Sequence, residues 1–180
     1  MLLDRLNTFL QCKSGVHPDL ILLLKDMLNH DVVPVIYEHG GVGASGDLVQ
    51  LAHMALAVIG EGEVWMDGNI VLAKDAFEHK KLTPFAIRLR EGLAMMNGTS
   101  CMTGVGLVNL HYAEKLLNLS CLVSVTINEI LNAFDDHLSE ALNEVKLHEG
   151  QNAVAKIMRE LISESTLMRN RQEHLYVETQ

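Results

Sequence analysis

The sequence is poor in residues that interrupt helices and in residues that β-sandwiches favour. Its 180 residues include three prolines, and 4% are aromatic although 48% are hydrophobic. Leu, Val, Ala, Ile and Met supply most of the apolar side chains, a mixture that favours packed helices over a β-sandwich. Few prolines also permit long helices. We therefore expect an all-α fold with a core large enough for one domain.

Basic residues and cysteines are also scarce. There are 14 Lys and Arg against 23 Asp and Glu, a net charge of −9, with no basic cluster that would bind nucleic acid. Three widely spaced cysteines indicate neither a disulfide framework nor a zinc site, so we expect a reducing, cytoplasmic setting. Nine scattered histidines give no metal-ligand spacing. No uncharged apolar run reaches the length of about 18 residues that a membrane span needs.

The chain contains helical patterns around one small predicted β-hairpin. Asp67-Gly68 lies between two short apolar runs, so residues 63–72 are expected to form that hairpin. Residues 31–38 look extended, and Pro34 places them at an edge or in an irregular segment. The expected helices cover residues 2–11, 18–29, 47–59, 73–80, 84–96, 99–148 and 151–163.

The longest expected helix, over 99–148, carries apolar residues at steps of three and four, so we expect one of its faces to be buried. These residues are Leu116, Leu119, Val123, Ile127, Ile130, Leu131 and Phe134. Helices this long do not easily close a compact core alone, so we expect a long-helix bundle that continues into further chain or partner subunits. We divide the partial domain 1–180 into a loop region 31–60, the hairpin, bundle helices 84–163 and a loose tail 164–180.

The stretch HGGVGASGDLVQLAH, residues 39–53, raises the question of function. Residues 41–46 read as G-x-G-x-x-G, the dinucleotide-binding pattern, which requires a preceding strand and an acid at the end of a second parallel strand. Pro34 precedes the loop, Asp67 lies in the hairpin turn, and no further β-α alternation follows. We therefore reject the nucleotide interpretation. From the residues alone, a structural loop with Ser45 as an N-cap is the default interpretation.

A third interpretation treats Ala44, Ser45 and Gly46 as reactants. In a sharp bend the Gly46 nitrogen attacks the Ala44 carbonyl carbon, and loss of water closes a five-membered imidazolone. Loss of a second water from Ser45 leaves an exocyclic methylidene, an electrophile that no ordinary side chain provides. Gly46 offers an unhindered nitrogen and unusual dihedrals, Asp47 can assist proton transfer, and neighbouring glycines such as Gly43 permit the tight path.

GVGASGDLVQLAH resembles the hallmark of the histidine and aromatic amino acid ammonia-lyase family, in which Ala-Ser-Gly-Asp-Leu forms 4-methylideneimidazole-5-one (MIO). LNTFLQCKSGV, GEGEV, KLTPFAIRLREGLAMMNGTS and the long helices after them resemble the family in order and spacing. The resemblance therefore extends over essentially the whole chain. It departs mildly at Gly41, where the family often has Ser, and at Val49-Gln50, where it often has Ala-Pro.

The resemblance implies a bacterial histidine or tyrosine type of lyase that eliminates ammonia from an aromatic L-amino acid, giving a trans-arylacrylate. It implies an autocatalytic MIO without metal or nucleotide. The residues of the implied ring and its surroundings are Ala44, Ser45 and Gly46 with Gly43, Asp47 and Leu48 in support. Asn97 of NGT is the implied catalytic donor, which hydrogen-bonds the ring carbonyl or the substrate. A simple helix break at Asn97-Gly98 is the structural alternative.

Family enzymes are homotetramers several hundred residues long whose active sites combine subunits. By resemblance, the tyrosine base lies before Met1 and a Tyr-Ser-x-Arg stretch lies after the end; Leu175-Tyr176-Val177 does not match it. We therefore expect a fragment with incomplete turnover. Tyr37 is not expected to act as the base, and His53 is expected to be a packing or helix-surface group. Two alternatives stay open: a non-catalytic helical assembly module with an uncyclised Ala-Ser-Gly, and an MIO-dependent 2,3-aminomutase.

Overall fold

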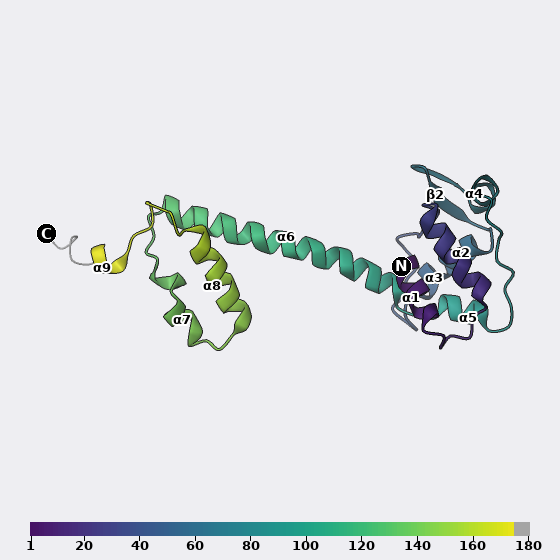
Figure 1. The fold of residues 1–180 in the computed structure, drawn as a ribbon, viewed down its shortest axis with the longest axis horizontal. Helices are drawn as coiled ribbons and strands as arrows, with labels where there is room; N and C mark the ends of the chain where they lie inside the picture. The colour runs from purple at the N-terminus through teal and green to yellow at the C-terminus, as the bar shows by residue number, and fades with distance from the viewer. Residues whose placement is uncertain (175–180) are drawn as a thin grey trace. The chain divides into compact units, whose positions relative to one another are not determined.

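The computed structural model describes residues 1–174, which divide between two compact units that meet in sequence at Val108 and Asn109. Both units are mainly helical, and the first also contains a small sheet (Figure 1). Helix α6, Ser100–Ile130, starts in the first unit and ends in the second. Among the helices of the described residues, none has the length and apolar character needed to span a membrane.

The core of the first unit lies among its short helices, which are α1 (Leu2–Leu10), α2 (Pro18–Asn29), α3 (Leu48–Val58), α4 (Ala73–Lys80) and α5 (Glu91–Met96). Pro18 opens α2 as predicted, and the His17 imidazole accepts the Asp19 N–H at 3.3 Å. Fully buried apolar side chains from several of these helices meet in the core. The largest include Phe9, Leu20, Leu24, Met27, Leu51, Met54, Phe77 and Met95.

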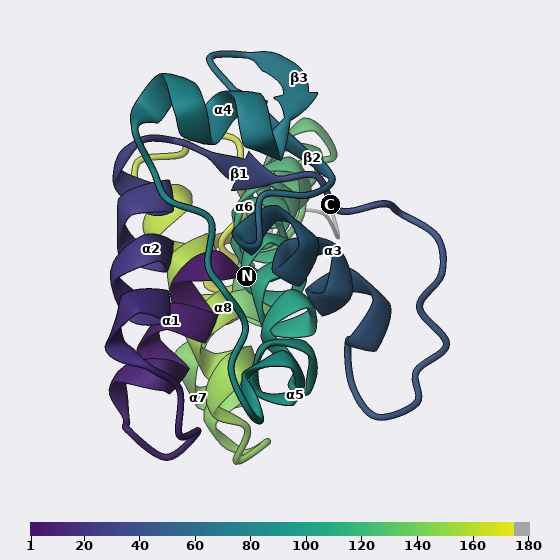
Figure 2. The same ribbon diagram turned by 90° about the vertical axis from the view of Figure 1, so that its right-hand side faces the viewer.

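The predicted hairpin is present, and a third strand joins it. Strands β1 (Val33–Pro34), β2 (Glu63–Met66) and β3 (Asn69–Leu72) form an antiparallel sheet in that order. Asp67 and Gly68 both have positive φ, 50° and 82°, as a two-residue hairpin turn requires. Pro34 lies on an edge strand, where its missing N–H costs no ladder bond. Helix α4 packs against β2 and β3 (Figure 2).

The helix predicted over 84–96 is wrong in its first half, since α5 begins at Glu91. Phe85 instead donates its N–H to the Val58 carbonyl at 3.0 Å and packs into the core. The buried Glu91 carboxylate accepts the N–H groups of His17 and Arg88, both at 2.7 Å. These tertiary bonds hold the segment extended, and they override the local Thr-Pro helix signal.

The helix predicted over 99–148 is also too long. Asn132 has a φ of 47°, and its N–H donates to the Glu129 carbonyl at 3.0 Å. The Ala133 N–H donates to the Asn128 carbonyl at 2.9 Å, which completes a Schellman motif with asparagine in the place of glycine. A 3-10 turn, Asp136–Leu138, and helices α7 (Glu140–Glu144), α8 (Glu149–Leu161) and α9 (Arg171–His174) follow.

Most of the apolar residues predicted to form the buried face of the helix over 99–148 are exposed, so the described residues do not provide the expected burial of that face. The exposed fractions of five of them, Leu116, Leu119, Val123, Ile127 and Ile130, run from 48% to 72%. Cys121 and Val125, which lie at other positions around the helix, are 3% exposed. A helix that is apolar over most of its circumference is normally buried on most sides, whereas here, among the described residues, only the side that carries Cys121 and Val125 is buried.

Part of the expected tail is held by backbone hydrogen bonds. The Arg169 N–H donates to Ala133, and the Asp135 N–H donates to Arg169, at 2.9 and 3.0 Å. Arg171 forms an ion pair of 2.8 Å with Asp136. The expectation for residues 175–180 lies outside the described part of the chain.

Leu24→Ala should lower the free energy of unfolding by about 2–5 kcal/mol, because Leu24 is fully buried and its loss leaves a cavity. Urea denaturation followed by circular dichroism measures the change. The matched control is Leu22→Ala on the same helix, where the side chain is 51% exposed and the expected loss is about 0.5 kcal/mol or less. Equal losses would contradict this assignment of the core.

Candidate functional site

The loop between β1 and α3 contains the sharp bend that the sequence predicts, and it extends outward from the helices (Figure 2). Gly43, Ser45 and Gly46 have φ values of 66°, 57° and 79°. Such left-handed values are uncommon for a residue with a side chain, so Ser45 marks a tight bend in the loop. Ala44 and Ser45 are exposed, while Gly46 and Asp47 are half-buried.

Gly46 lies against Gly98, and this contact joins the two motifs identified in the sequence. The two glycines form an isolated parallel bridge, and the Asp47 N–H donates to the Gly98 carbonyl at 2.9 Å. A Cβ atom at position 46 would collide with that carbonyl oxygen. Glycine at 46 is therefore required both for its positive φ and for this close approach. The contact brings Ala44, Ser45 and Gly46 beside the segment of Asn97.

Asp47 connects the loop to the start of α6. Its carboxylate accepts the Met102 N–H, in the first turn of α6, at 2.8 Å. A carboxylate at this position satisfies an orphan donor and interacts favourably with the positive helix end. Asp47 is also the N-cap residue of α3, which excludes Ser45 from that role, and Leu48 is the first residue of α3.

Behind the Asn97 segment lies a buried guanidinium. Arg5 of α1 is 4% exposed, and its Nη2 donates to the carbonyls of Met95 and Asn97 at 3.1 and 2.9 Å. Burial lowers the pKa of Arg5 from its ordinary value, while the charges of Asp4 and Asp47 raise it. These carbonyls belong to the end of α5, where a cation is favourable.

Asn97 is the C-cap residue of α5, and its N–H donates to the Leu93 carbonyl at 2.9 Å. Its side chain is exposed beside a cavity of about 420 Å³. Arg5, Thr8, Ser14 and Gly98 are among the other residues that line this cavity. The structure thus places Asn97 next to the loop, and its side chain is not buried at the end of the helix.

Tyr37 and His53 contact each other. Their rings meet edge to face at 5.0 Å, and the Tyr37 N–H donates to His53 Nδ1 at 3.4 Å. The Tyr37 hydroxyl donates to Glu63 at 2.7 Å, and this hydrogen bond and the charge of Glu63 raise the pKa of Tyr37. A raised pKa disfavours the phenolate, so Tyr37 is poorly suited to be a base.

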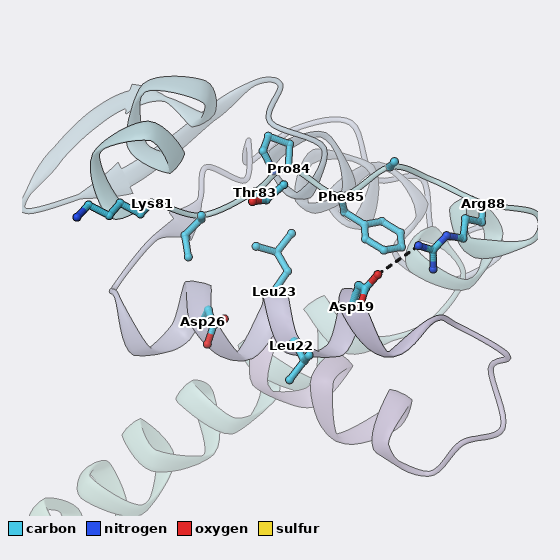
Figure 3. A pocket seen from close by; sticks show the side chains of 11 residues that line it. Asp19, Leu22, Leu23, Asp26, Lys81, Thr83, Pro84, Phe85 and Arg88 are labelled. Carbon is cyan, nitrogen blue, oxygen red and sulfur yellow. Dashed lines mark hydrogen bonds and ion pairs between the residues drawn. The ribbon is translucent and has the colours of Figure 1, made fainter.

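A second cavity of about 420 Å³ lies between α2 and the extended segment before α5 (Figure 3). Its polar groups include Asp19 and Arg88, which pair with each other at 3.2 Å. None of the predicted site residues lines it. Across the described residues, no group of His, Cys, Asp and Glu has the arrangement that could hold a metal ion.

Residues 1–178 match the family model of the aromatic amino acid lyases. The chain belongs to the aromatic amino acid lyase family. Among its curated relatives, it is 42% identical over 169 residues to a tyrosine 2,3-aminomutase of Myxococcus sp. (strain Mx-B0), covering 94% of this chain and 32% of that protein. It is also 42% identical over 169 residues to a histidine ammonia-lyase of Stigmatella aurantiaca, covering 93% of this chain and 33% of that protein.

Solved structures of the aromatic amino acid lyase family share the fold. The chain superimposes on the phenylalanine aminomutase of Pantoea agglomerans with a TM-score of 0.92 and 28% identity, over 99% of this chain and 35% of that one. The predicted family and helical fold class are therefore confirmed. The chain spans about a third of the length of the curated relatives that it matches.

The sequence indicated the lyase-family loop, but neither its contact with Gly98 nor the buried Arg5 behind that contact was predicted. The Gly46–Gly98 approach joins segments far apart in the chain, and no local pattern predicts it. Arg5 carried a readable signal, because it shares the apolar face of α1 with Leu2, Leu6 and Phe9 at helical spacing.

Asp47→Asn should lower the pKa of Cys101. Burial raises the pKa of that thiol most, the charge of Asp47 raises it further, and the N-terminal ammonium lowers it. Removing the Asp47 charge leaves burial in force, so the pKa should fall toward its ordinary value without reaching it. The pH dependence of alkylation, resolved at Cys101 by mass spectrometry, measures the change.

The control is Asp19→Asn. Asp19 lies on α2, where it pairs with Arg88, and it does not contribute to the pKa of Cys101. The asparagine at 47 keeps an oxygen that can accept the Met102 N–H, so α6 should still start there. An unchanged Cys101 titration in Asp47→Asn would contradict the placement of Asp47 beside α6.

Proposed function

We propose that Ala44, Ser45 and Gly46 cyclise to MIO, and that the protein uses it to eliminate ammonia from an aromatic L-amino acid. Histidine or tyrosine is the proposed substrate, a trans-arylacrylate is the product, and the cytoplasm is the proposed location. The observation that carries the proposal is the left-handed turn at Ser45 and Gly46, held against Gly98. Conversion of this turn requires no metal and no nucleotide.

The proposed cyclisation balances with the loss of two water molecules. The Gly46 nitrogen bonds to the Ala44 carbonyl carbon, and the carbonyl oxygen leaves with the amide hydrogens of Gly46 and Ser45. The Ser45 hydroxyl then leaves with the Ser45 Cα hydrogen, which creates the methylidene. The product supplies an electrophilic carbon to which a substrate amine can add.

The residues around the turn fit this chemistry. Successive left-handed residues fold the chain back on itself, as ring closure between Ala44 and Gly46 needs. The two hydrogen bonds of Asp47, to Gly98 and from Met102, hold the end of the turn. We assign Gly43 and Leu48 supporting places at the two ends of the turn.

We assign Asn97 the role of a neutral donor to the ring carbonyl or the substrate. Its side chain is exposed, and its neighbour Gly98 touches the turn. Negative charge that develops on an oxygen during the reaction is stabilised by a directional donor that needs no rearrangement.

A 2,3-aminomutase is the second candidate, because the chain is as similar to a tyrosine 2,3-aminomutase as to a histidine ammonia-lyase, 42% in both comparisons. Both activities are assigned to the same Ala44-Ser45-Gly46 turn. Chromatography of the products formed from histidine, tyrosine and phenylalanine separates them. Arylacrylate with free ammonia supports the lyase, whereas a β-amino acid supports the mutase.

The proposed partner is a second copy of this chain, within a tetramer as in the family, with no nucleic acid or membrane involved. The exposed apolar residues of α6 between Leu116 and Ile130 form the proposed contact surface. So much exposed apolar surface on one helix indicates that another protein surface covers it. The acidic net charge of −9 argues against nucleic acid as the partner.

The purified chain should have a mass lower than its sequence by two waters, with the loss confined to the peptide that contains residues 44–46. Ser45→Ala should remove the methylidene, because alanine has no hydroxyl to lose, while the fold stays intact. Intact-mass and peptide mass spectrometry measure both. Ser14→Ala is the control, since that serine lies outside the turn and should not alter the mass loss.

Retention of the second dehydration in Ser45→Ala would contradict the assignment of Ser45. An unmodified mass in the wild-type chain would contradict cyclisation in this chain and support the alternative of a non-catalytic assembly module.

Leu119→Lys should weaken self-association by about tenfold or more, because it places a charge in the proposed apolar contact surface. Leu119 is 54% exposed, so the substitution should not disturb the fold of the free chain. Asn118→Lys is the control, an equal charge at the adjacent exposed position. Sedimentation analysis over a range of concentrations measures the effect, and equal behaviour of the two variants would exclude this face.

A further inference from the structure

We propose that Arg5 is a positioning residue: through the Asn97–Gly98 peptide, it holds the turn of residues 44–47 in the conformation that cyclisation requires. Arg5 belongs to α1, far from the turn in sequence, and it does not touch the reacting atoms. The inference rests on the proposed function where it concerns cyclisation, but the positioning itself can be measured separately.

The guanidinium binds the end of α5 at two points. One nitrogen, Nη2, donates to both Met95 and Asn97, whose carbonyls lie where a helix runs out of internal donors. The planar fork of arginine suits such convergent acceptors, and a lysine ammonium lacks that fixed geometry. Arg5 therefore fixes the direction in which the chain leaves α5.

Gly98 lies between the guanidinium and the turn. A Cβ at Gly98 would come within 2.5 Å of Nη2 and 2.7 Å of Nη1 of Arg5. Because the φ of Gly98 is outside the left-handed region, glycine is needed here for space and not for conformation. The carbonyl of the same residue accepts the Asp47 N–H and abuts Gly46. A shift of Arg5 is thus transmitted across one peptide to the turn.

Stability alone explains this arginine poorly. Arg5 Nε is buried and has no hydrogen-bond partner among the described residues. A buried cation with an unsatisfied donor generally stabilises a fold less than an apolar side chain of similar volume. Its cost is partly offset by Asp4 and Asp47, whose charges favour the charged guanidinium. The second of these carboxylates is the one that anchors the turn.

The test is the hydrogen exchange of the Asp47 amide, read by NMR in the 180-residue chain. Arg5→Met keeps the apolar stem and removes the fork, so exchange at Asp47 should become about tenfold faster while α2 and α3 keep their protection. Arg5→Lys should restore part of the protection. Arg88→Met is the matched control, because Arg88 pairs with Asp19 away from the turn. If Arg5→Met leaves the exchange rate of the Asp47 amide unchanged, or raises the rates of all amides by the same factor, the proposal is overturned.

A double-mutant cycle tests the contact without relying on one variant. Gly98→Ala should speed exchange at Asp47 in the wild-type background, because its methyl group displaces the guanidinium. In the Arg5→Ala background the methyl group enters vacated space, so adding Gly98→Ala should cause little further change. If Gly98→Ala speeds exchange at Asp47 by the same factor in both backgrounds, the proposal is overturned.

The mass of the same proteins separates this inference from the proposed function. Where the wild-type chain loses two waters, Arg5→Met should slow that loss by about tenfold under conditions in which circular dichroism shows it fully folded. A wild-type chain that keeps both waters would contradict cyclisation, whereas exchange at Asp47 would still decide whether Arg5 positions the turn.

Discussion

The contact between Gly46 and Gly98 is the constraint on which the arrangement of the site depends. Neither glycine has room for a side chain: a Cβ at 46 would meet the Gly98 carbonyl, and a Cβ at 98 would meet the guanidinium of Arg5. The Asp47 N–H then has an acceptor at 2.9 Å. Three segments, from α1, the loop and the end of α5, are thereby held at one point.

Two charged side chains, Asp47 and Arg5, account for the electrostatic interactions around this contact. One carboxylate, Asp47, accepts from the first turn of α6, favours the charge of Arg5 and disfavours ionisation of Cys101. The cation of Arg5 serves the negative end of α5, and the anion of Asp47 serves the positive end of α6. The Asn97 segment therefore lies between two helix ends, the end of α5 and the start of α6, and each of them has a side chain of opposite charge beside it.

Local sequence signals predicted the elements whose boundaries depend on local chemistry. Pro18 opens α2, and Asp67-Gly68 turns the hairpin, because proline and the positive-φ turn act within a few residues. The end of α6 was missed because Asn132 adopts the left-handed conformation usually given to glycine. The extended segment before α5 was missed because it is held by partners distant in the sequence: Phe85 donates its N–H to Val58, and the carboxylate of Glu91 accepts the N–H of His17.

In the site too, the residues could be predicted from local motifs, whereas their contacts could not. The tripeptide, Asp47 and Asn97 were readable from motifs, but their meeting at Gly98 is a tertiary event. In the sequence, the loop and its partner segment are separated by strands β2 and β3 and by helices α3, α4 and α5, so local structure alone cannot bring them together. Under the proposed cyclisation, ring closure follows that long-range contact and does not reverse with unfolding. Each mature chain would then carry a permanent covalent record that it had once folded, readable even after denaturation.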